Sequence, residues 1–233
     1  MNDIRGQAFE CLYDRDSRLQ ISGIHFTNCS FESCGFSITN DPALRSRASG
    51  LCFSKCTVGG SIIWGGVLED IVVDGLKTRG LLQCWATVFR HVVLKGKIGR
   101  IMVSRSACPS ASGFAPVHIQ DAFDRANCVF YQCVDWALDI KDGEFEECEI
   151  QGVPSRLIRR DHQTQVVVKR EKALLGAWRE LDLSGTHWAT SLDFLLARED
   201  DDVVLVAGKR NKNFRRLQDG LELLRKAGVA EWD

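Results

Sequence analysis

Large side chains recur at every fifth residue through the middle of the chain. A period of five matches neither an α-helix nor a simple strand, whose side-chain periods are 3.6 and 2. It predicts a coil that turns a corner every five residues. The predicted inward centres, all apolar except Thr78 and Gln83, are Phe53, Val58, Ile63, Leu68, Val73, Thr78, Gln83, Val88, Val93, Ile98 and Val103. A second set of mostly small or apolar residues lies two positions before each centre.

The same period appears on both sides of this stretch. Earlier centres are Ile21, Phe26, Phe31 and Phe36, and later ones are Phe130, Ile140, Phe145 and Ile150, preceded at two positions by Cys128, Leu138, Gly143 and Cys148. Asp135 stands where another centre is due, and a buried carboxylate is costly, so we expect a bulge that turns Trp136 inward. The runs are separated by predicted loops at 39–49 and 104–114, and residues 115–125 fit either a strand or a short helix.

Two adjacent units, Cys29-Ser30-Phe31-Glu32-Ser33 and Cys34-Gly35-Phe36-Ser37-Ile38, have a small residue or Cys, then a polar residue, then Phe. This pattern resembles the pentapeptide-repeat family, in degenerate form, over residues 19–152. The resemblance implies a right-handed, four-sided parallel β-helix with about four units per turn, so that residues twenty apart stack about 4.8 Å apart. The stacks it implies are Phe53 with Val73 and Val93, Leu68 with Val88, Phe130 with Ile150, and Cys128 with Cys148.

A competing architecture is the left-handed hexapeptide helix. Steps of six from Phe53 reach Gly59, Gly65, Ile71, Lys77 and Gln83, and this set is not apolar. We therefore expect a mainly-β, right-handed quadrilateral parallel β-helix, a solenoid, with a C-terminal α-helical unit.

Three regions follow from the pattern. Residues 1–18 are predicted to form an N-terminal cap, since a solenoid must cover its first apolar layer. Residues 19–155 form the repeat region, and residues 156–233 form a mostly helical unit that either caps the solenoid or forms a homodimer. Within this unit the spacing predicts strands at 166–168 and 203–206 and helices at 170–181, 190–198 and 213–226.

Composition narrows the classes of function. The net charge is -1, and no apolar run is long enough to span a bilayer, so we expect neither a membrane partner nor general attraction to nucleic acid. The N-terminus lacks a signal-peptide core, which predicts a cytoplasmic protein. The ten cysteines mostly occupy repeat positions, as expected for buried thiols rather than zinc ligands or disulfides, and we expect no metal or cofactor.

The most concentrated charge in the sequence is acidic. Six acidic residues, opposed only by Lys141, fall within eleven positions: Asp139, Asp142, Glu144, Glu146, Glu147 and Glu149. We call these six the acidic segment. None is a centre or lies two positions before one, so all six are predicted to point outward and to form a negative surface for a partner protein.

Other charged groups are weaker candidates. Arg159, Arg160 and His162 could hold a phosphate or carboxylate, or simply form a solvated junction. His91 occupies an inward position and is expected in the core or at its edge, and no histidine lies in a recognisable nucleophile motif. The basic run 209–216 is expected to be the solvated start of a helix rather than a nucleic-acid site.

These observations favour a non-enzymatic binding protein, in its most concrete form an inhibitor or immunity protein that neutralises a basic toxin, nuclease or other enzyme. The family resemblance implies an alternative, a DNA mimic that binds a topoisomerase. Residues 1–155 carry 18 acidic and 15 basic residues, which is too balanced for such a mimic. A third alternative is a carbohydrate-active β-helix enzyme, which would need paired carboxylates in a groove.

Overall fold

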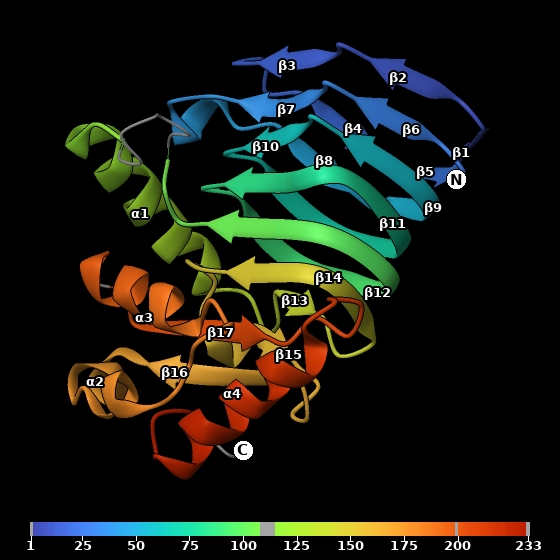
Figure 1. The fold of residues 1–233 in the computed structure, drawn as a ribbon. Helices are drawn as coiled ribbons and strands as arrows, with labels where there is room; N and C mark the ends of the chain where they lie inside the picture. Colours follow the sequence, from blue (N-terminus) through green and yellow to red (C-terminus); the bar gives the residue numbers. More distant parts are fainter. Residues whose placement is uncertain (1, 108–114, 199, 232–233) are drawn as a thin grey trace.

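The computed structural model describes residues 2–107, 115–198 and 200–231, and most of its strands pair in parallel and are stacked one above another (Figure 1). The strands before the C-terminal unit are β1 (Asn2–Arg5), β2 (Ala8–Glu10), β3 (Tyr13–Arg15), β4 (Gln20–Ser22), β5 (Ile24–Thr27), β6 (Ser30–Glu32), β7 (Gly35–Ile38), β8 (Arg47–Ser49), β9 (Cys52–Gly59), β10 (Ile62–Trp64), β11 (Val67–Trp85), β12 (Val88–Ser104), β13 (Leu138–Asp139) and β14 (Gly143–Ile150). Helix α1 (Val117–Tyr131) lies between β12 and β13.

Strand pairing follows a regular order along the chain. β1 to β4 pair in parallel with β5 to β8 respectively, β9 lies beside β5 and β6, and β11 lies between β9 and β12. The inner residues of these strands form one continuous apolar core. The expectation of a mainly-β fold with parallel strands and a few C-terminal helices is confirmed.

The predicted register holds at first and then slips by one residue. Val73 lies beside Phe53, as predicted, but its neighbour on β12 is Leu94, whereas Val93 lies beside Val72. Leu68 lies beside Phe89 rather than Val88 for the same reason. The predicted stack through Val93 is therefore wrong by one position.

The cause of the slip is one extra residue around Gly80. Arg79 pairs with Gly59, twenty residues earlier, whereas Gln83 pairs with Ile62, twenty-one residues earlier. The extra residue replaces Gln83 by the buried Cys84 as the neighbour of Ile63. This explains why a polar residue stood at a predicted inward centre.

Backbone conformation accounts for the five-residue period. Residues with a left-handed conformation lie in register across successive strands, and most come two positions after a predicted centre. One such set is Gly6, Asn28, Lys55, Gly75 and Gly96, and a second is Cys11, Ser33, Gly60 and Gly80. A third set is Gly23, Gly50, Asp70 and His91, and Gly65 and Ala86 belong to a fourth. A left-handed residue interrupts the extended chain and redirects it. Figure 1 shows this as the bends in β9, β11 and β12.

The centre predicted at Phe130 is wrong, because residues 117–131 form helix α1. Cys128 is exposed on this helix and Cys148 lies beside Ile101, so the predicted neighbours are apart. The helix docks through Phe123, which is buried against Ala86 and Ala107. Helical packing has displaced the repeat here, and the segment 115–125, which fitted either element, is helical from Val117.

Around the predicted bulge, Trp136 is half-buried and the following residues Ala137 and Leu138 are buried. Trp136 therefore does not enter the core as predicted. Later inward positions are confirmed, with Ile140, Phe145 and Ile150 almost fully buried.

The segment predicted as an N-terminal cap instead supplies β1, β2 and β3, which belong to the same sheet. The predicted loop 39–49 is shorter, because β8 occupies 47–49 and a short 3₁₀-helix spans Pro42–Leu44. Of the loop predicted at 104–114, residues 108–114 lie outside the described residues.

The C-terminal unit combines strands with helices. Its elements are β15 (Ile158–Arg159), β16 (Gln165–Lys169), α2 (Arg170–Leu174), α3 (Trp188–Ala197), β17 (Asp202–Val206) and α4 (Phe214–Lys226), with 3₁₀-helices at Ser155–Leu157 and Ala177–Glu180. The predicted strands and the last two predicted helices are confirmed, whereas the helix predicted over 170–181 ends at Leu174. The unit has its own core around Trp188, Leu192 and Leu221.

This unit joins the end of the sheet directly. β17 pairs antiparallel with β14 at Glu149 and Ile150 and with the whole of β16. Arg105 on the β12 side reaches both Asp124 on α1, at 2.8 Å, and the buried Asp200, at 2.9 Å. Within the described part of the chain, no helix has the length and apolar character required to cross a membrane.

Candidate functional site

The acidic segment lies on β13, on β14 and on the turn between them, near the C-terminal end of the parallel sheet, where β15 pairs with β13. On β14, Phe145, Cys148 and Ile150 are buried while Glu144 and Glu147 are exposed. The buried positions Gly143, Phe145, Cys148 and Ile150 are the inward centres and the residues two positions before them, so burial here follows the five-residue repeat. Asp142, in the turn before β14, is also exposed.

Asp139 does not point outward as predicted, because its side chain is only 9% exposed. Lys141 and Arg159 approach its carboxylate at 3.6 and 3.9 Å, and the backbone N–H of Lys141 donates to it at 3.3 Å. This carboxylate is used within the fold and is removed from the predicted partner surface.

The prediction also fails in part for Glu149, which is half-buried beside β17. Burial raises the pKa of this carboxyl group, and the nearby Arg198 partly offsets that rise. The side-chain amide of Gln151 donates to it at 2.6 Å. Glu149 is therefore tied to the junction with the C-terminal unit.

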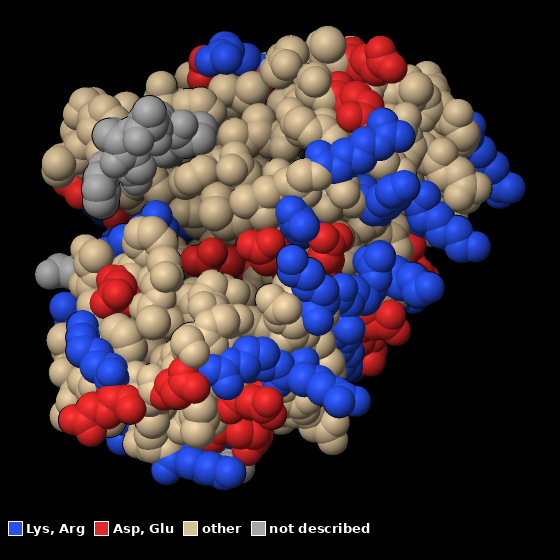
Figure 2. Space-filling model, viewed as in Figure 1, with Lys and Arg blue, Asp and Glu red and all other residues tan. Residues whose placement is uncertain are grey.

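Basic side chains of β12 lie beside the exposed acidic ones. Lys97 stands opposite Glu144 and Arg100 opposite Glu147 in the strand register. The Arg100 guanidinium is 2.9 Å from Glu146 and 3.9 Å from Glu147. Figure 2 shows the result as a row of acidic groups across the middle of this face, with Lys and Arg gathered at one end of the row.

The basic run 209–216 also meets the acidic segment. The Arg210 guanidinium donates to the Ile98 carbonyl at 3.1 Å, and its backbone N–H donates to Phe145 at 2.9 Å. Lys209 pairs with Asp161 at 2.8 Å. This run comprises the loop before α4 and the first residues of that helix, as expected for a helix start, and its loop packs onto β14, a contact that sequence spacing alone gave no means of finding.

Two of the three residues of the predicted anion site, Arg159 and His162, make other contacts within the protein. Arg159 lies 4.1 Å from the Trp136 ring and near Asp139, and the carbonyl of His162 accepts from Arg225. Asp161, between Arg160 and His162, accepts from Thr164 at 2.9 Å as well as pairing with Lys209. An anion site at Arg159, Arg160 and His162 stays a prediction.

His91 forms a charged cluster that the sequence pattern did not predict. Its two ring nitrogens lie 3.0 Å from Asp70 and 2.7 Å from Asp135, and its ring lies 4.7 Å from that of Trp136. The hydrogen bond with Asp135 raises the pKa of His91, and that of Asp135 is lowered in turn. Because each carboxylate meets a different nitrogen, the cluster is a bridge between neighbouring turns.

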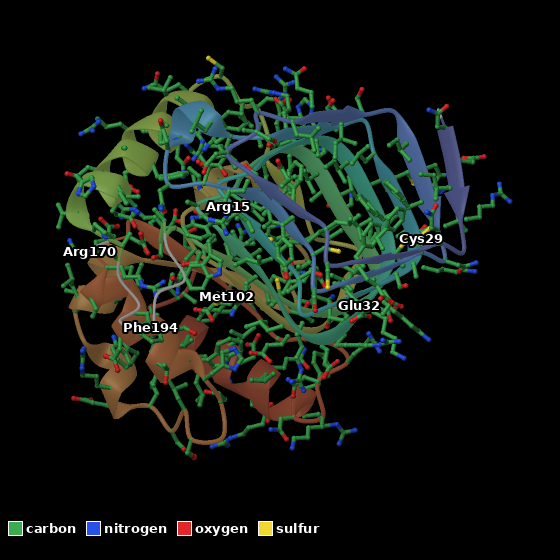
Figure 3. All side chains as sticks on the ribbon, turned by 90° about the horizontal axis from the view of Figure 1, so that it is seen from above. Arg15, Cys29, Glu32, Met102, Arg170 and Phe194 are labelled. Carbon is green, nitrogen blue, oxygen red and sulfur yellow. The ribbon has the colours of Figure 1, made fainter. Side chains whose placement is uncertain are left out.

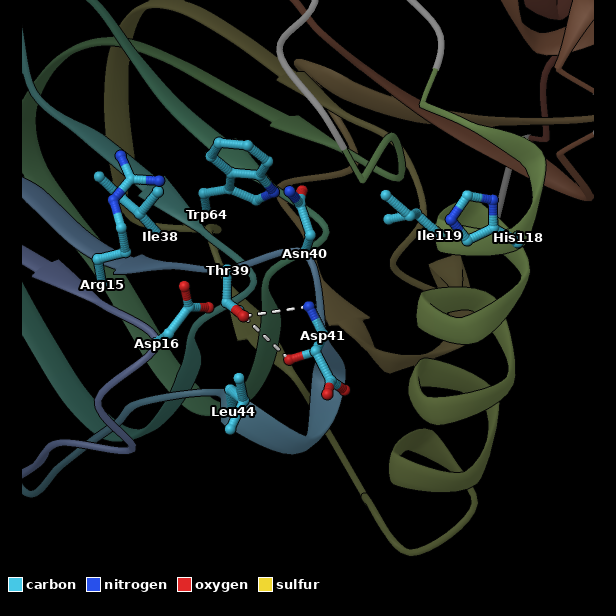
Figure 4. A pocket seen from close by; sticks show the side chains of 10 residues that line it. All are labelled: Arg15, Asp16, Ile38, Thr39, Asn40, Asp41, Leu44, Trp64, His118 and Ile119. Carbon is cyan, nitrogen blue, oxygen red and sulfur yellow. Dashed lines mark hydrogen bonds between the residues drawn. The ribbon is translucent and has the colours of Figure 1, made fainter.

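One pocket of about 390 Å³ opens between the 3₁₀-helix at 42–44 and the start of α1 (Figure 4). Its lining includes two acidic groups, Asp16 and Asp41, and two basic ones, Arg15 and His118, around the Trp64 ring. Trp64 donates its indole N–H to the Ala107 carbonyl at 2.6 Å, so the polar edge of this ring is occupied. The pocket has no single charge preference.

No protein-family model matches this sequence, and no curated protein matches it. The function must therefore be argued from the surface of the molecule itself.

Proposed function

We propose that this protein is a non-enzymatic, protein-binding solenoid that recognises a basic partner through the exposed part of its acidic segment. The proposal rests on one observation: Asp142, Glu144 and Glu147 are exposed together on β14 and on the turn that precedes it.

The architecture we propose is the right-handed, four-sided β-helix implied by the resemblance to pentapeptide-repeat proteins. In support of it, left-handed residues recur in register and most come two positions after an inward centre. Neighbouring strands are offset by nineteen to twenty-three residues where no loop intervenes, as in the pairs of Val73 with Phe53 (twenty) and of Asn2 with Ile24 (twenty-two). Four units of five residues account for this offset.

Such a scaffold suits recognition of a protein surface. Backbone pairing on both sides holds most strands in place, so the exposed carboxylates keep their spacing in the free protein. Preorganised charge accelerates association and selects orientation more than it increases affinity. Exposed charges also cost little to desolvate, because they can stay at the wet rim of an interface.

The basic groups beside the acidic row limit the kinds of partner that can bind there. Lys97 and Arg100 face Glu144 and Glu147 across one strand spacing, so the surface alternates in sign over a few ångströms. A partner with a narrow basic ridge fits this arrangement better than a partner that needs a continuous negative surface. We therefore favour an inhibitor or immunity protein for a basic toxin, nuclease or other enzyme over a DNA mimic.

The test begins with proteins cross-linked to the tagged chain in the cells that naturally express it. Each captured protein is then purified and its binding is measured by surface plasmon resonance. Reversing charge in D142K/E144K/E147K should slow association at low salt at least about tenfold, because rim charges act mainly on the association rate.

A matched control reverses three exposed carboxylates elsewhere, in D121K/E171K/E180K. It changes net charge equally and should leave the association rate within about twofold, because charges beyond a Debye length are screened. A partner that binds both variants equally well, or one whose binding is lost in both, contradicts the proposed surface.

A further inference from the structure

The two ends of the parallel sheet are finished differently, and the N-terminal end is open. β1, β2, β3 and β4 each pair on one side only within the described residues, with β5, β6, β7 and β8. Alternate N–H and C=O groups of a parallel strand point to opposite edges. One edge of each of these four strands therefore presents unpaired backbone groups (top of Figure 1).

The apolar side chains at this end are also uncovered. Leu12, Tyr13 and Leu19 are 56%, 61% and 41% exposed. Phe9 stacks on Phe31 with ring centroids 5.0 Å apart and both are only half-buried, whereas Val58, on the far side of Phe31, is buried. Figure 3 looks onto this end from above.

An open edge with exposed apolar groups is a template for another chain. Four short strands joined by left-handed turns form this end, and a partner must turn at the same intervals to pair with all of them. A second copy of the same end meets this requirement, since a two-fold axis sets each strand antiparallel to a strand of similar length.

Charge at this end suits a second copy as well. The exposed groups include Asp3, Glu10 and Asp16 among the acids and Arg5, Arg15 and Arg18 among the bases. Because both signs are present in equal number, two identical ends can pair opposite charges. A strongly acidic or strongly basic partner would be attracted by one set of charges and repelled by the other.

We propose that the protein forms a two-fold dimer in which the open ends formed by β1 to β4 pair with each other. The dimer extends the sheet across both chains and buries Leu12, Leu19 and the outer face of Phe9. This interface is separate from the acidic segment, which lies at the opposite end of the parallel sheet.

Sedimentation equilibrium of the full chain tests this directly. The wild type should sediment at twice the 26.1 kDa chain mass. L12K/L19K should sediment as a monomer or associate at least about tenfold more weakly, because burying unpaired ammonium groups is costly. Both leucines are exposed, so the circular dichroism spectrum of the variant should match that of the wild type.

The matched control is L174K/L175K, which places the same two charges on leucines of the C-terminal unit that are 57% and 78% exposed. It should leave the dimer intact. As a second measurement, backbone amides of β1 to β4 should exchange with deuterium more slowly at high protein concentration. A monomeric wild type, or a dimer dissociated only by L174K/L175K, would overturn the proposal and favour assembly through the C-terminal helices instead.

Discussion

The two ends of the parallel sheet differ in how their terminal strands are covered. At the C-terminal end, β17 pairs with β14, and the inward residues there, such as Ile150, are 2% exposed. At the N-terminal end, β1 to β4 have one unpaired edge, and Leu12 is 56% exposed. A layer of parallel strands is therefore core at one end and surface at the other, and the difference lies in whether another strand pairs with it.

Thiol labelling should show the largest difference between the ends. Cys11 is exposed at the open end, whereas Cys148 on β14 is 2% exposed and burial raises its pKa. Because Cys148 reacts only after the core opens, Cys11 should react with a thiol reagent at least about a thousandfold faster. Mass spectrometry of timed samples measures both rates. Similar rates would mean that the C-terminal unit does not seal the sheet.

Truncating one aliphatic side chain at each end compares how much the two ends contribute to the free energy of unfolding. Ile150→Ala removes a buried side chain and should lower the free energy of unfolding by about 2–5 kcal/mol. Leu12→Ala at the open end should cost less than about 0.5 kcal/mol in the monomer, because an exposed side chain leaves no cavity. Urea unfolding measures both changes. A large cost for Leu12→Ala at low protein concentration would show that the open end is packed.

The left-handed positions allow a finer comparison. Lys55, in the middle of the sheet, and Cys11, at its open end, have φ of +54° and +53°. Glycine adopts this conformation without steric cost, so Lys55→Gly should stabilise the protein by about 0.5–1 kcal/mol. Cys11→Gly should have a smaller effect, since terminal strands fray. A destabilising Lys55→Gly would argue against backbone strain at these turns.

The smallest expected effect is the pH dependence of the His91 cluster, which lies between the two ends. The hydrogen bond to Asp135 raises the pKa of His91, so its contribution to stability is present below the ordinary histidine value of about 6.5 and is lost as pH rises through the raised value. The lowered pKa of Asp135 means that this carboxylate's contribution is lost only in acid.

Thermal unfolding of wild type and His91→Gln should therefore differ most in mildly acidic buffer, above the pKa of Asp135 and below that of His91. The difference should shrink as pH rises above neutrality. Asp193→Asn, an exposed change in the C-terminal unit, provides the control. A difference that grows with pH would contradict the charged bridge.

Sequence reasoning located the repeat but not every position in it. The centres Ile140, Phe145 and Ile150 and the pair Phe53 with Val73 could be predicted because inward positions in a stacked coil must be apolar. Val93 was misplaced because one extra residue near Gly80 shifts the positions that follow it as far as Leu94, and a fixed period cannot detect a single insertion. Phe130 was misplaced because an apolar residue suits a buried helix face as well as a strand.

The candidate surface shows the same limit. Exposure of Asp142, Glu144 and Glu147 followed from the five-residue repeat, in which none of the three is an inward centre or lies two positions before one. The burial of Asp139 and the partial burial of Glu149 could not be predicted from the repeat, because they depend on contacts with Arg159 and with β17, which lie elsewhere in the chain. The bridge of His91 with Asp70 and Asp135 joins residues from three separate parts of the sequence, which no local spacing connects.

The sequence by itself determined that the chain is mainly β, that apolar residues recur every five positions, and that helices follow at the C-terminus, because these depend on local side-chain patterns. Tertiary structure decided which strand neighbours which, that a helix interrupts the repeat, and that one end of the sheet is covered while the other is open. Those outcomes depend on contacts between distant residues, where a single inserted residue or a long-range ion pair changes which side chains meet.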